Sequence, residues 1–208
     1  MIQRKLAEVG LGWNCSIGRD ASIRLDELNT RIRTDIWGRT VRVNVYEGHE
    51  IRLLSTEEDL KSNIEKLNKV MNYIKPKIND SCGLHVHLDM RNRNADECYD
   101  KLLKAQTQMY KMQPKERKNN RHSGRRATTT SNGKYYAINR SSDREKKTIE
   151  VRLHSGCTDI IDILNWTNFL VKIVDSKTKA KRFTKPFYKR ILGEDTYDYM
   201  VERESRFA

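Results

Sequence analysis

The chain has 208 residues, of which 37% are hydrophobic, enough for one core of ordinary domain size. No stretch approaches the roughly 18 apolar residues of a membrane span, and the first residues carry no secretory apolar segment, so we expect a cytoplasmic protein without a membrane partner. The formal charge of +13 favours an anionic substrate or nucleic acid.

The first quarter of the chain predicts one helix followed by short strands. The helix is expected over Ile2–Val9 and ends at Gly10, because glycine accepts the backbone conformation that closes a helix. Short runs in which apolar and polar residues alternate are typical of half-buried strands. Strands are expected over Trp13–Ile17 and Ala21–Leu25, which bracket a turn at Gly18–Asp20, and over Val41–Val45 and His49–Leu54.

Three longer segments have apolar residues at helical spacing. The first begins at Ser55, which could form a capping box with Glu58, and it ends before Pro76. The second covers about Ala95–Met112, and the third covers about Ile160–Val174. The alternation of strands and helices predicts an α+β fold with helices packed on one face of a sheet.

Two segments lie outside this pattern. Pro114–Gly133 is polar and without a period, which predicts a long loop of functional importance or without order. Arg182–Ala208 predicts a peripheral helical tail. We therefore expect a catalytic domain over residues 1–176 and a basic helical C-terminal tail over residues 177–208.

The segment Leu84–Met90 alternates without interruption. Its apolar residues occupy every second position and face a core, because side chains on a strand point to opposite faces in turn. The intervening side chains, His85, His87 and Asp89, share the other face, and this composition favours metals and phosphates. Gly83 permits close approach of a ligand or of another backbone.

A second alternating strand lies at Thr148–His154. Its apolar residues point to the core, whereas Glu150, Arg152 and His154 are expected to share the opposite face. A carboxylate suits a divalent cation, and a guanidinium offers a planar fork to phosphate oxygens. A cross-strand ion pair on an ordinary surface is the alternative reading. Glu50 is a third acid on a predicted strand.

Other functions remain open from these residues alone. A metal-dependent hydrolase could use His85, His87 and Asp89 as ligands. A structural zinc ion could be held by Cys82, His85 and His87, although no second ligand pair is evident. The remaining cysteines are expected to be reduced thiols, because none shows a CxxC spacing.

A non-enzymatic nucleic-acid-binding protein is a further alternative, which rests on charge alone. Most of the excess charge lies in Lys115–Arg126 and Lys177–Arg190. Neither segment interleaves aromatic residues regularly with its bases, as a platform for stacked nucleotides would. Nucleic acid is therefore possible but not favoured as a partner.

Taken together, these motifs resemble those of the amidoligase family, a branch of the glutamine synthetase-like carboxylate–amine ligases. Ser81–Asp89 is similar to that family's Gly-x-His-x-His strand, and Thr148–Gly156 is similar to its Thr-x-Glu-x-Arg strand. The similarity extends over about residues 10–175. Weaker matches are Asp20–Ser22, His49–Ile51, Tyr136–Arg140 and the helix that contains Trp166.

The resemblance implies a curved, mainly antiparallel sheet with helices on its outer face and with ATP and Mg²⁺ on its inner face. The implied activity joins a carboxylate to an amine through an acyl phosphate, and the carboxylate acceptor, the amine donor and the number of subunits stay open. The implied roles are metal ligation by His85, Glu150 and Glu50, phosphate contact and catalysis by His87 and Arg152, further phosphate contact by Arg140, and a place near the substrates for Asp20.

The sequence departs from the family at one place. The family's first strand carries a Gly-x-Glu-x-Glu motif whose acids are metal ligands, and no counterpart precedes Ile2. A truncated start, acids supplied by another chain and an inactive relative are the three explanations that remain open. The Pro114–Gly133 loop is expected to close over the site.

Overall fold

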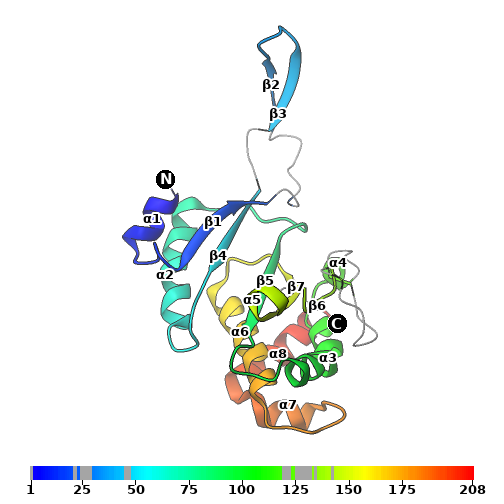
Figure 1. The fold of residues 1–208 in the computed structure, drawn as a ribbon. Helices are drawn as coiled ribbons and strands as arrows, with labels where there is room; N and C mark the ends of the chain where they lie inside the picture. The colour runs from blue at the N-terminus through cyan, green and yellow to red at the C-terminus, as the bar shows by residue number, and fades with distance from the viewer. Residues whose placement is uncertain are drawn as a thin grey trace. The chain divides into compact units, whose positions relative to one another are not determined.

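The computed structural model describes residues 2–20, 23, 30–44, 48–118, 123–124, 133, 135–141 and 143–208. The fold is mixed α+β, with small antiparallel sheets and with helices throughout (Figure 1). The chain divides into two compact units, Met1–Cys82 and Gly83–Ala208. This division differs from the expected boundary at residue 176.

The first unit is built on a two-stranded antiparallel ribbon. Strand β1 (Cys15–Arg19) pairs with β4 (His49–Leu53), with Ile17 opposite Ile51. Helices α1 (Ile2–Glu8) and α2 (Leu60–Ile74) belong to the same unit. Its core consists of Leu6, Leu11, Cys15 and Val70, with Ile2, Val9, Ile51, Leu53, Leu67 and Ile74 packed against them.

A separate hairpin lies between these two strands in the sequence. Strands β2 (Thr30–Thr34) and β3 (Thr40–Asn44) pair in antiparallel fashion. The Asp35 carboxylate accepts hydrogen bonds from the backbone N–H groups of Trp37 and Arg39, at 2.9 Å each, and Gly38 takes a φ of 76° that glycine permits. The turn leaves Ile36 88% exposed and Trp37 72% exposed.

The second unit contains a three-stranded antiparallel sheet in the order β5–β7–β6. Strand β7 (Thr148–Ser155) lies in the middle, between β5 (Gly83–Asp89) and β6 (Ile138–Asn139). His87 lies opposite Glu150 in one pairing, and Asn139 lies opposite the same residue in the other. Glu150 therefore has a strand neighbour on each side.

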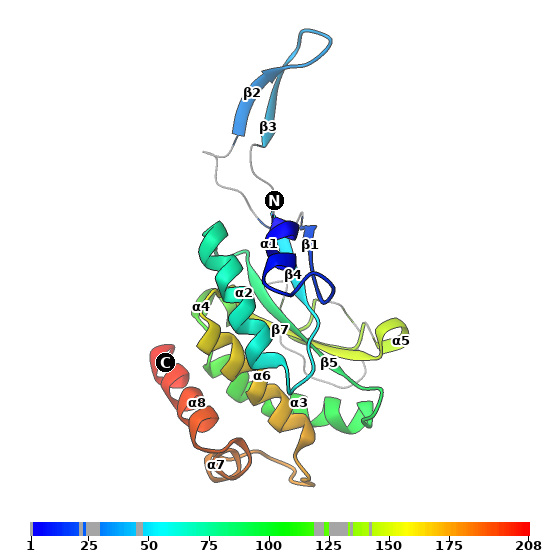
Figure 2. The ribbon, with the colours of Figure 1, turned by 90° about the vertical axis from the view of Figure 1, so that its left-hand side faces the viewer.

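Helices cover one face of this sheet. Helices α3 (Ala95–Lys111) and α6 (Ile160–Asp175) pack against each other and against the strands (Figure 2). Each begins at a side chain that satisfies free backbone N–H groups: Asn94 for α3 and Asp159 for α6. The short helices of this unit are α4 (Lys115–Lys118) and α5 (Asp143–Lys146).

The C-terminal segment completes the core of the second unit. Helices α7 (Lys185–Leu192) and α8 (Glu194–Arg206) pack against α6 and against each other. Their apolar side chains join those of the sheet and of α3 in one continuous cluster. The expectation of a peripheral tail is therefore wrong, because Phe187, Tyr188, Leu192, Tyr199 and Met200 are buried.

An irregularity interrupts the pairing of β5 with β7. Leu84 lies opposite His154 and Val86 lies opposite Val151, so that His85 faces the two residues between them. Such a bulge changes the face to which the following side chains point. His154 is accordingly completely buried against Trp166, with ring centroids 5.0 Å apart, and does not share the face of Glu150 as expected.

The long elements agree closely with the sequence patterns. The helices over Ile2–Val9, Ala95–Met112 and Ile160–Val174 are confirmed to within a residue or two. The inward facing of the apolar residues in β5 and β7 is confirmed as well, since all of them belong to the core or pack against it.

Two local expectations in the first unit are wrong. The Ser55–Glu58 capping box does not form, because α2 begins at Leu60 and the Ser55 hydroxyl donates to the Thr56 carbonyl oxygen. The turn expected at Gly18 is part of β1. The strand expected at Ala21–Leu25 lies, apart from residue 23, outside the described residues, as does most of the Pro114–Gly133 loop.

In the part of the chain that the structure describes, no helix combines the length and the apolar character needed to cross a bilayer.

The packing of α6 predicts a matched pair of substitutions. Leu170→Ala should lower the free energy of unfolding by about 2–5 kcal/mol, because Leu170 is completely buried and its truncation leaves a cavity. Ile161→Ala in the same helix should change it by about 0.5 kcal/mol or less, because Ile161 is 65% exposed. Chemical denaturation measures both values, and equal losses would contradict the facing of α6.

Candidate functional site

The candidate site lies on the face of the β5–β7–β6 sheet opposite the core. Glu150 stands at its centre, in the middle of β7, with Ile149 and Val151 pointing to the core on either side. The Glu150 side chain is almost completely buried although it points away from the core. A buried carboxylate requires partners, and the neighbouring strands supply them.

Both oxygens of the Glu150 carboxylate have polar neighbours. Arg152 Nη1 donates to Oε1 at 2.9 Å, and Asn139 Nδ2 donates to Oε2 at 3.0 Å. The arginine lies two residues along the same strand, and the asparagine lies directly opposite on β6. Donors on both oxygens fix the orientation of the carboxylate.

Both histidines of β5 reach the same carboxylate. His85 Nδ1 lies 3.4 Å from Glu150 Oε1, and His87 Nε2 lies 3.7 Å from it. His87 Nδ1 is 3.1 Å from the hydroxyl of Thr148. The sequence expectation that His85, His87, Glu150 and Arg152 share one wall of the sheet is therefore confirmed as geometry.

Two further residues of this wall were missed in the sequence. Asn139 belongs to a motif that drew attention only to Arg140, although alternation along β6 points the asparagine to the face of Glu150. Arg117, from the segment expected to be a loop, is 3% exposed and donates to the carbonyl oxygens of Arg152 and Leu153. No sequence pattern marked this long-range contact.

Gly83 lies next to the side chains of Arg117 and His85, with little space for a side chain of its own. A Cβ atom at this position would lie 2.9 Å from Arg117 Nη2 and 3.1 Å from His85 Nε2. The close neighbours at Gly83 are two side chains, a guanidinium and an imidazole, where another backbone was expected; the approach of a ligand stays a prediction. Any larger residue would push one of them aside.

Arg140 and Asp89 lie apart from this group. Arg140 pairs with Asp96 at the start of α3, and its guanidinium lies 5.6 Å from the centre of the Tyr99 ring. Asp89 binds Arg91, at 2.6 Å between Oδ2 and Nη2, and this contact holds the pKa of Asp89 below its ordinary value. The structure thus brings neither of them to the Glu150 carboxylate.

Glu50 and Asp20 belong to the first unit. Glu50 Oε2 lies 2.5 Å from Arg52 Nε on the exposed side of β4. Asp20 follows β1, and its backbone N–H donates to the carbonyl oxygen of Gly48 at 2.8 Å. The role expected for Glu50 as a partner of Glu150 stays a prediction.

The donor set of the wall suits a metal that arrives with a nucleotide. Among the described residues, no three His, Cys, Asp or Glu side chains are gathered as a metal cage. Mg²⁺ is usually held by one or two carboxylates together with phosphate oxygens and water, and a cage made only of protein ligands is not required. Glu150, with His85 beside it, fits that mode if Arg152 releases the shared oxygen.

The same arrangement weakens the alternative metal sites. The hydrolase reading needs Asp89 beside His85 and His87, whereas Asp89 is turned toward Arg91. The zinc reading needs Cys82, whose sulfur contacts Asn79 Oδ1 at 3.7 Å. Within the second unit, Asp89 does not stand with the two histidines in the described contacts.

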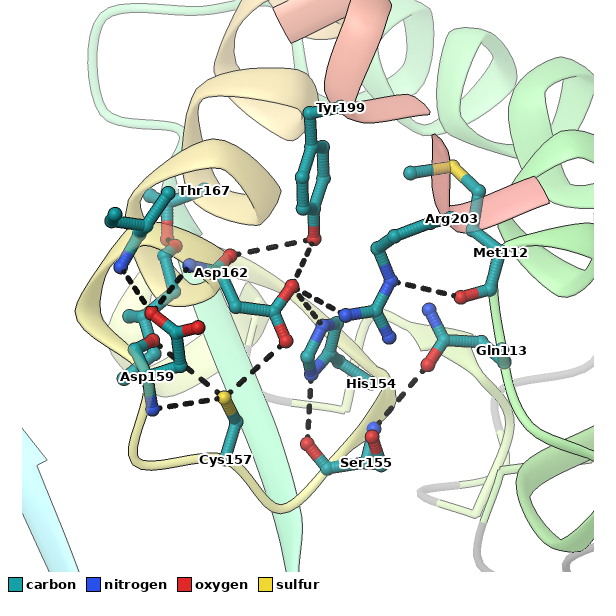
Figure 3. Close-up of polar contacts among 12 residues, drawn as sticks. Met112, Gln113, His154, Ser155, Cys157, Asp159, Asp162, Thr167, Tyr199 and Arg203 are labelled. Carbon is teal, nitrogen blue, oxygen red and sulfur yellow. Dashed lines mark hydrogen bonds and ion pairs between the residues drawn. The ribbon is translucent and has the colours of Figure 1, made fainter. Parts of the chain in front are cut away.

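A second polar cluster lies at the C-terminal end of β7, on the helix side of the sheet. Asp162 is at its centre, and Figure 3 shows its carboxylate between Arg203, Tyr199, His154 and Cys157. Tyr199 donates to Oδ1 at 2.8 Å, Arg203 pairs with the same oxygen, and Cys157 donates to Oδ2 at 3.3 Å. The cluster joins β7, α6 and α8.

Cysteine, histidine and aspartate in one cluster invite a comparison with a catalytic triad, and the chemistry argues against it. Burial, together with the charge of Asp162, raises the pKa of Cys157 to about 12, so that the thiol stays protonated at neutral pH. Burial lowers the pKa of His154, whose Nδ1 donates to the Ser155 carbonyl oxygen at 2.7 Å. The cluster is a structural network.

Asp162 is the ionised member of this network. Burial by itself favours the neutral acid, but the contacts with His154 and Arg203 outweigh it and hold the pKa of Asp162 well below its ordinary value. Arginine stays protonated in proteins, so the charge of Arg203 balances that of Asp162. This pair fixes α8 to the start of α6.

Comparison with family models, with curated proteins and with solved structures found no match.

The Asp162 network predicts a pH-dependent contribution to stability. Asp162→Asn should lower the free energy of unfolding by about 3–5 kcal/mol near pH 7, because it leaves the buried Arg203 without its counter-charge. The native carboxylate has the lower pKa, so the unfolded chain binds the extra proton. The advantage of Asp162 is therefore complete above the unfolded pKa of about 3.9 and is lost as the pH falls below it.

Urea denaturation of both proteins between about pH 3 and pH 7 measures this difference, with Glu202→Gln as the control. Glu202 forms an exposed pair with Arg206 on the same helix, and its replacement should change little. A penalty for Asp162→Asn that stayed constant across this range would contradict the assignment.

Proposed function

We propose that the chain is an ATP-dependent carboxylate–amine ligase of the glutamine synthetase-like type, with its nucleotide site on the Glu150 wall. The single observation that carries the proposal is the gathering of His85, His87 and Arg152 around the Glu150 carboxylate. These side chains come from two strands that the sequence marked independently. The β5–β7–β6 sheet would then be part of the concave sheet of such a ligase.

The contacts within the wall suggest how its residues divide the work. Glu150 is the carboxylate that would hold Mg²⁺, with His85 Nδ1 next to it. Arg152, which pairs with Glu150 in the structure, offers its planar guanidinium to phosphate oxygens once the metal takes its place on Oε1. His87, whose Nδ1 is hydrogen-bonded to the Thr148 hydroxyl, would make a second phosphate contact.

The proposed reaction class is that of the ligases whose motifs the chain resembles. In the ligases that the chain resembles, a substrate carboxylate attacks the γ-phosphate of ATP, ADP leaves, and an amine then displaces phosphate from the acyl phosphate. Cationic groups that face the phosphate oxygens stabilise the negative charge of the transferring group. Arg152 would supply such a group from this chain, His87 would contact a phosphate oxygen through its ring, and His85 and Glu150 would hold the metal.

The proposal predicts that nucleotide binding depends on Mg²⁺ through Glu150. Calorimetric titration of the full chain with a non-hydrolysable ATP analogue should show binding that weakens about tenfold or more without Mg²⁺. In Glu150→Gln the Mg²⁺ dependence should disappear. The amide keeps nearly the same shape as the carboxylate, but it cannot replace the carboxylate as a Mg²⁺ ligand.

Asp89→Asn is the matched control, because Asp89 lies on the adjacent strand and is turned toward Arg91. It should bind the analogue like the unaltered chain, and thermal unfolding should confirm that both variants are folded. The proposal fails if the unaltered chain binds no nucleotide at millimolar concentration, or if Asp89→Asn loses Mg²⁺ dependence as Glu150→Gln does.

A second variant separates phosphate contact from metal ligation. Arg152→Lys should weaken analogue binding both with and without Mg²⁺, because lysine keeps the charge but loses the planar fork. The Mg²⁺ dependence itself should remain, since Glu150 is unchanged. An Arg152→Lys chain with unaltered affinity would remove Arg152 from the phosphate site.

A further inference from the structure

The segment from Lys177 to Arg190 concentrates positive charge on a surface other than the proposed nucleotide site. It contains seven cationic residues and no acidic residue. We call the exposed cations of this segment the basic strip; they are Lys177, Lys179, Lys181, Arg182, Lys185, Lys189 and Arg190.

Most of this charge is not neutralised within the protein. All members of the basic strip are exposed, and Lys185 is weakly paired, with its Nζ 3.5 Å from Glu204 Oε2. Arg190 lies over the ring of Phe187 at 5.6 Å. Among the described residues, no acid lies within ion-pair distance of the other five members. Neighbouring cations that repel one another favour an external polyanion.

The apolar residues of the segment hold the strip in place. Phe183 stacks on Phe187 with ring centroids 4.2 Å apart, and Tyr188 stacks on Phe169 of α6 at 6.1 Å. Phe187 and Tyr188 are 6% and 3% exposed. Because Phe187 and Tyr188 point inward, the exposed cations of α7 lie on its outer side, and the other members of the strip are exposed on the segment that leads into it.

The same packing narrows the kind of polyanion. Binding of single strands relies on exposed aromatic rings that stack on bases, and interfacial membrane helices insert exposed apolar residues. In the Lys177–Arg190 segment, Phe187 and Tyr188 are buried in the core and Phe183 packs against it. The exposed side chains of the segment are therefore mainly cations. A rigid array of phosphates, as in a double helix, needs nothing more than charge.

We propose that the basic strip binds the phosphate backbone of double-stranded nucleic acid without reading its sequence. This surface lies on the helix side of the second unit, where α7 packs against α6 and α8 and away from β7 (Figure 1). Glu150 points to the opposite face of the sheet. The binding therefore goes beyond the ligase proposal and does not depend on it.

The test uses the full chain and a fluorescent DNA duplex of about 20 base pairs, followed by anisotropy between about 50 and 200 mM salt. Replacing Lys177, Lys179, Lys181 and Arg182 with glutamine removes four charges. The affinity at the lower salt should fall at least about tenfold, and the slope of log K against log salt should shrink by about 3–4. These side chains are exposed, so the thermal midpoint should not change.

A matched control removes the same number of charges from the first unit. Lys61, Lys69, Lys75 and Lys77, all exposed, are replaced with glutamine. This variant should keep the affinity and most of the salt slope. If it loses as much affinity as the first variant, binding follows net charge and the strip is not the site.

Two competing partners are measured in parallel with the same proteins. Vesicles containing phosphatidylserine that bind the unaltered chain more tightly than the duplex would overturn the assignment in favour of a membrane surface. A single strand of the same length that binds more tightly would overturn the double-helix assignment. Absence of duplex binding at about 50 mM salt would also overturn the proposal.

Discussion

Alternation along β7 is the constraint on which the second unit depends. This strand pairs with β5 along its length and with β6 at Glu150 and Val151, so the directions of these two side chains are fixed from both sides. Ile149, Val151 and Leu153 thereby enter the core, and Glu150 and Arg152 point to the opposite face. A single strand thus supplies both the apolar support and the charged centre of the candidate site.

Because Glu150 is buried, its carboxylate must be paired either with side chains of the protein or with a ligand. Leaving such a carboxylate unpaired would cost several kcal/mol, and Arg152 and Asn139 prevent that cost in the absence of any ligand. A ligand must therefore offer more than these two residues do. The proposed divalent cation with its phosphate would meet that condition, because it would replace one positive charge on the carboxylate and give the displaced guanidinium a new anion.

The sequence predicted the parts of the structure that follow a simple period. The helices around Leu102 and Trp166 and the two faces of Leu84–Met90 were predictable, because their periodicity reflects one-sided burial. The same alternation predicted the face of each of His85, His87, Glu150 and Arg152 within its own strand. Their gathering on one wall depends in addition on the pairing of β5 with β7, which the family resemblance suggested and the alternation alone did not.

What the sequence could not predict depends on registers and long-range contacts. No sequence pattern indicates the bulge between β5 and β7. Because of the bulge, the His154 side chain points to the core and not to the face of the candidate site. The buried place of Arg117 depends on carbonyl groups more than thirty residues away, in a strand whose position a single sequence does not give. The family resemblance implied a role for Arg140, whereas the structure pairs Arg140 with Asp96 and brings Asn139 to Glu150.

The three tryptophans lie in very different surroundings, and the fluorescence of the chain is therefore divided between its two units. Trp13 and Trp37 belong to the first unit and are 84% and 72% exposed, whereas Trp166 belongs to the second and is completely buried. A soluble quencher such as iodide reaches only the first two. Emission that survives quenching thus comes from Trp166, and its red shift on unfolding would follow the second unit by itself.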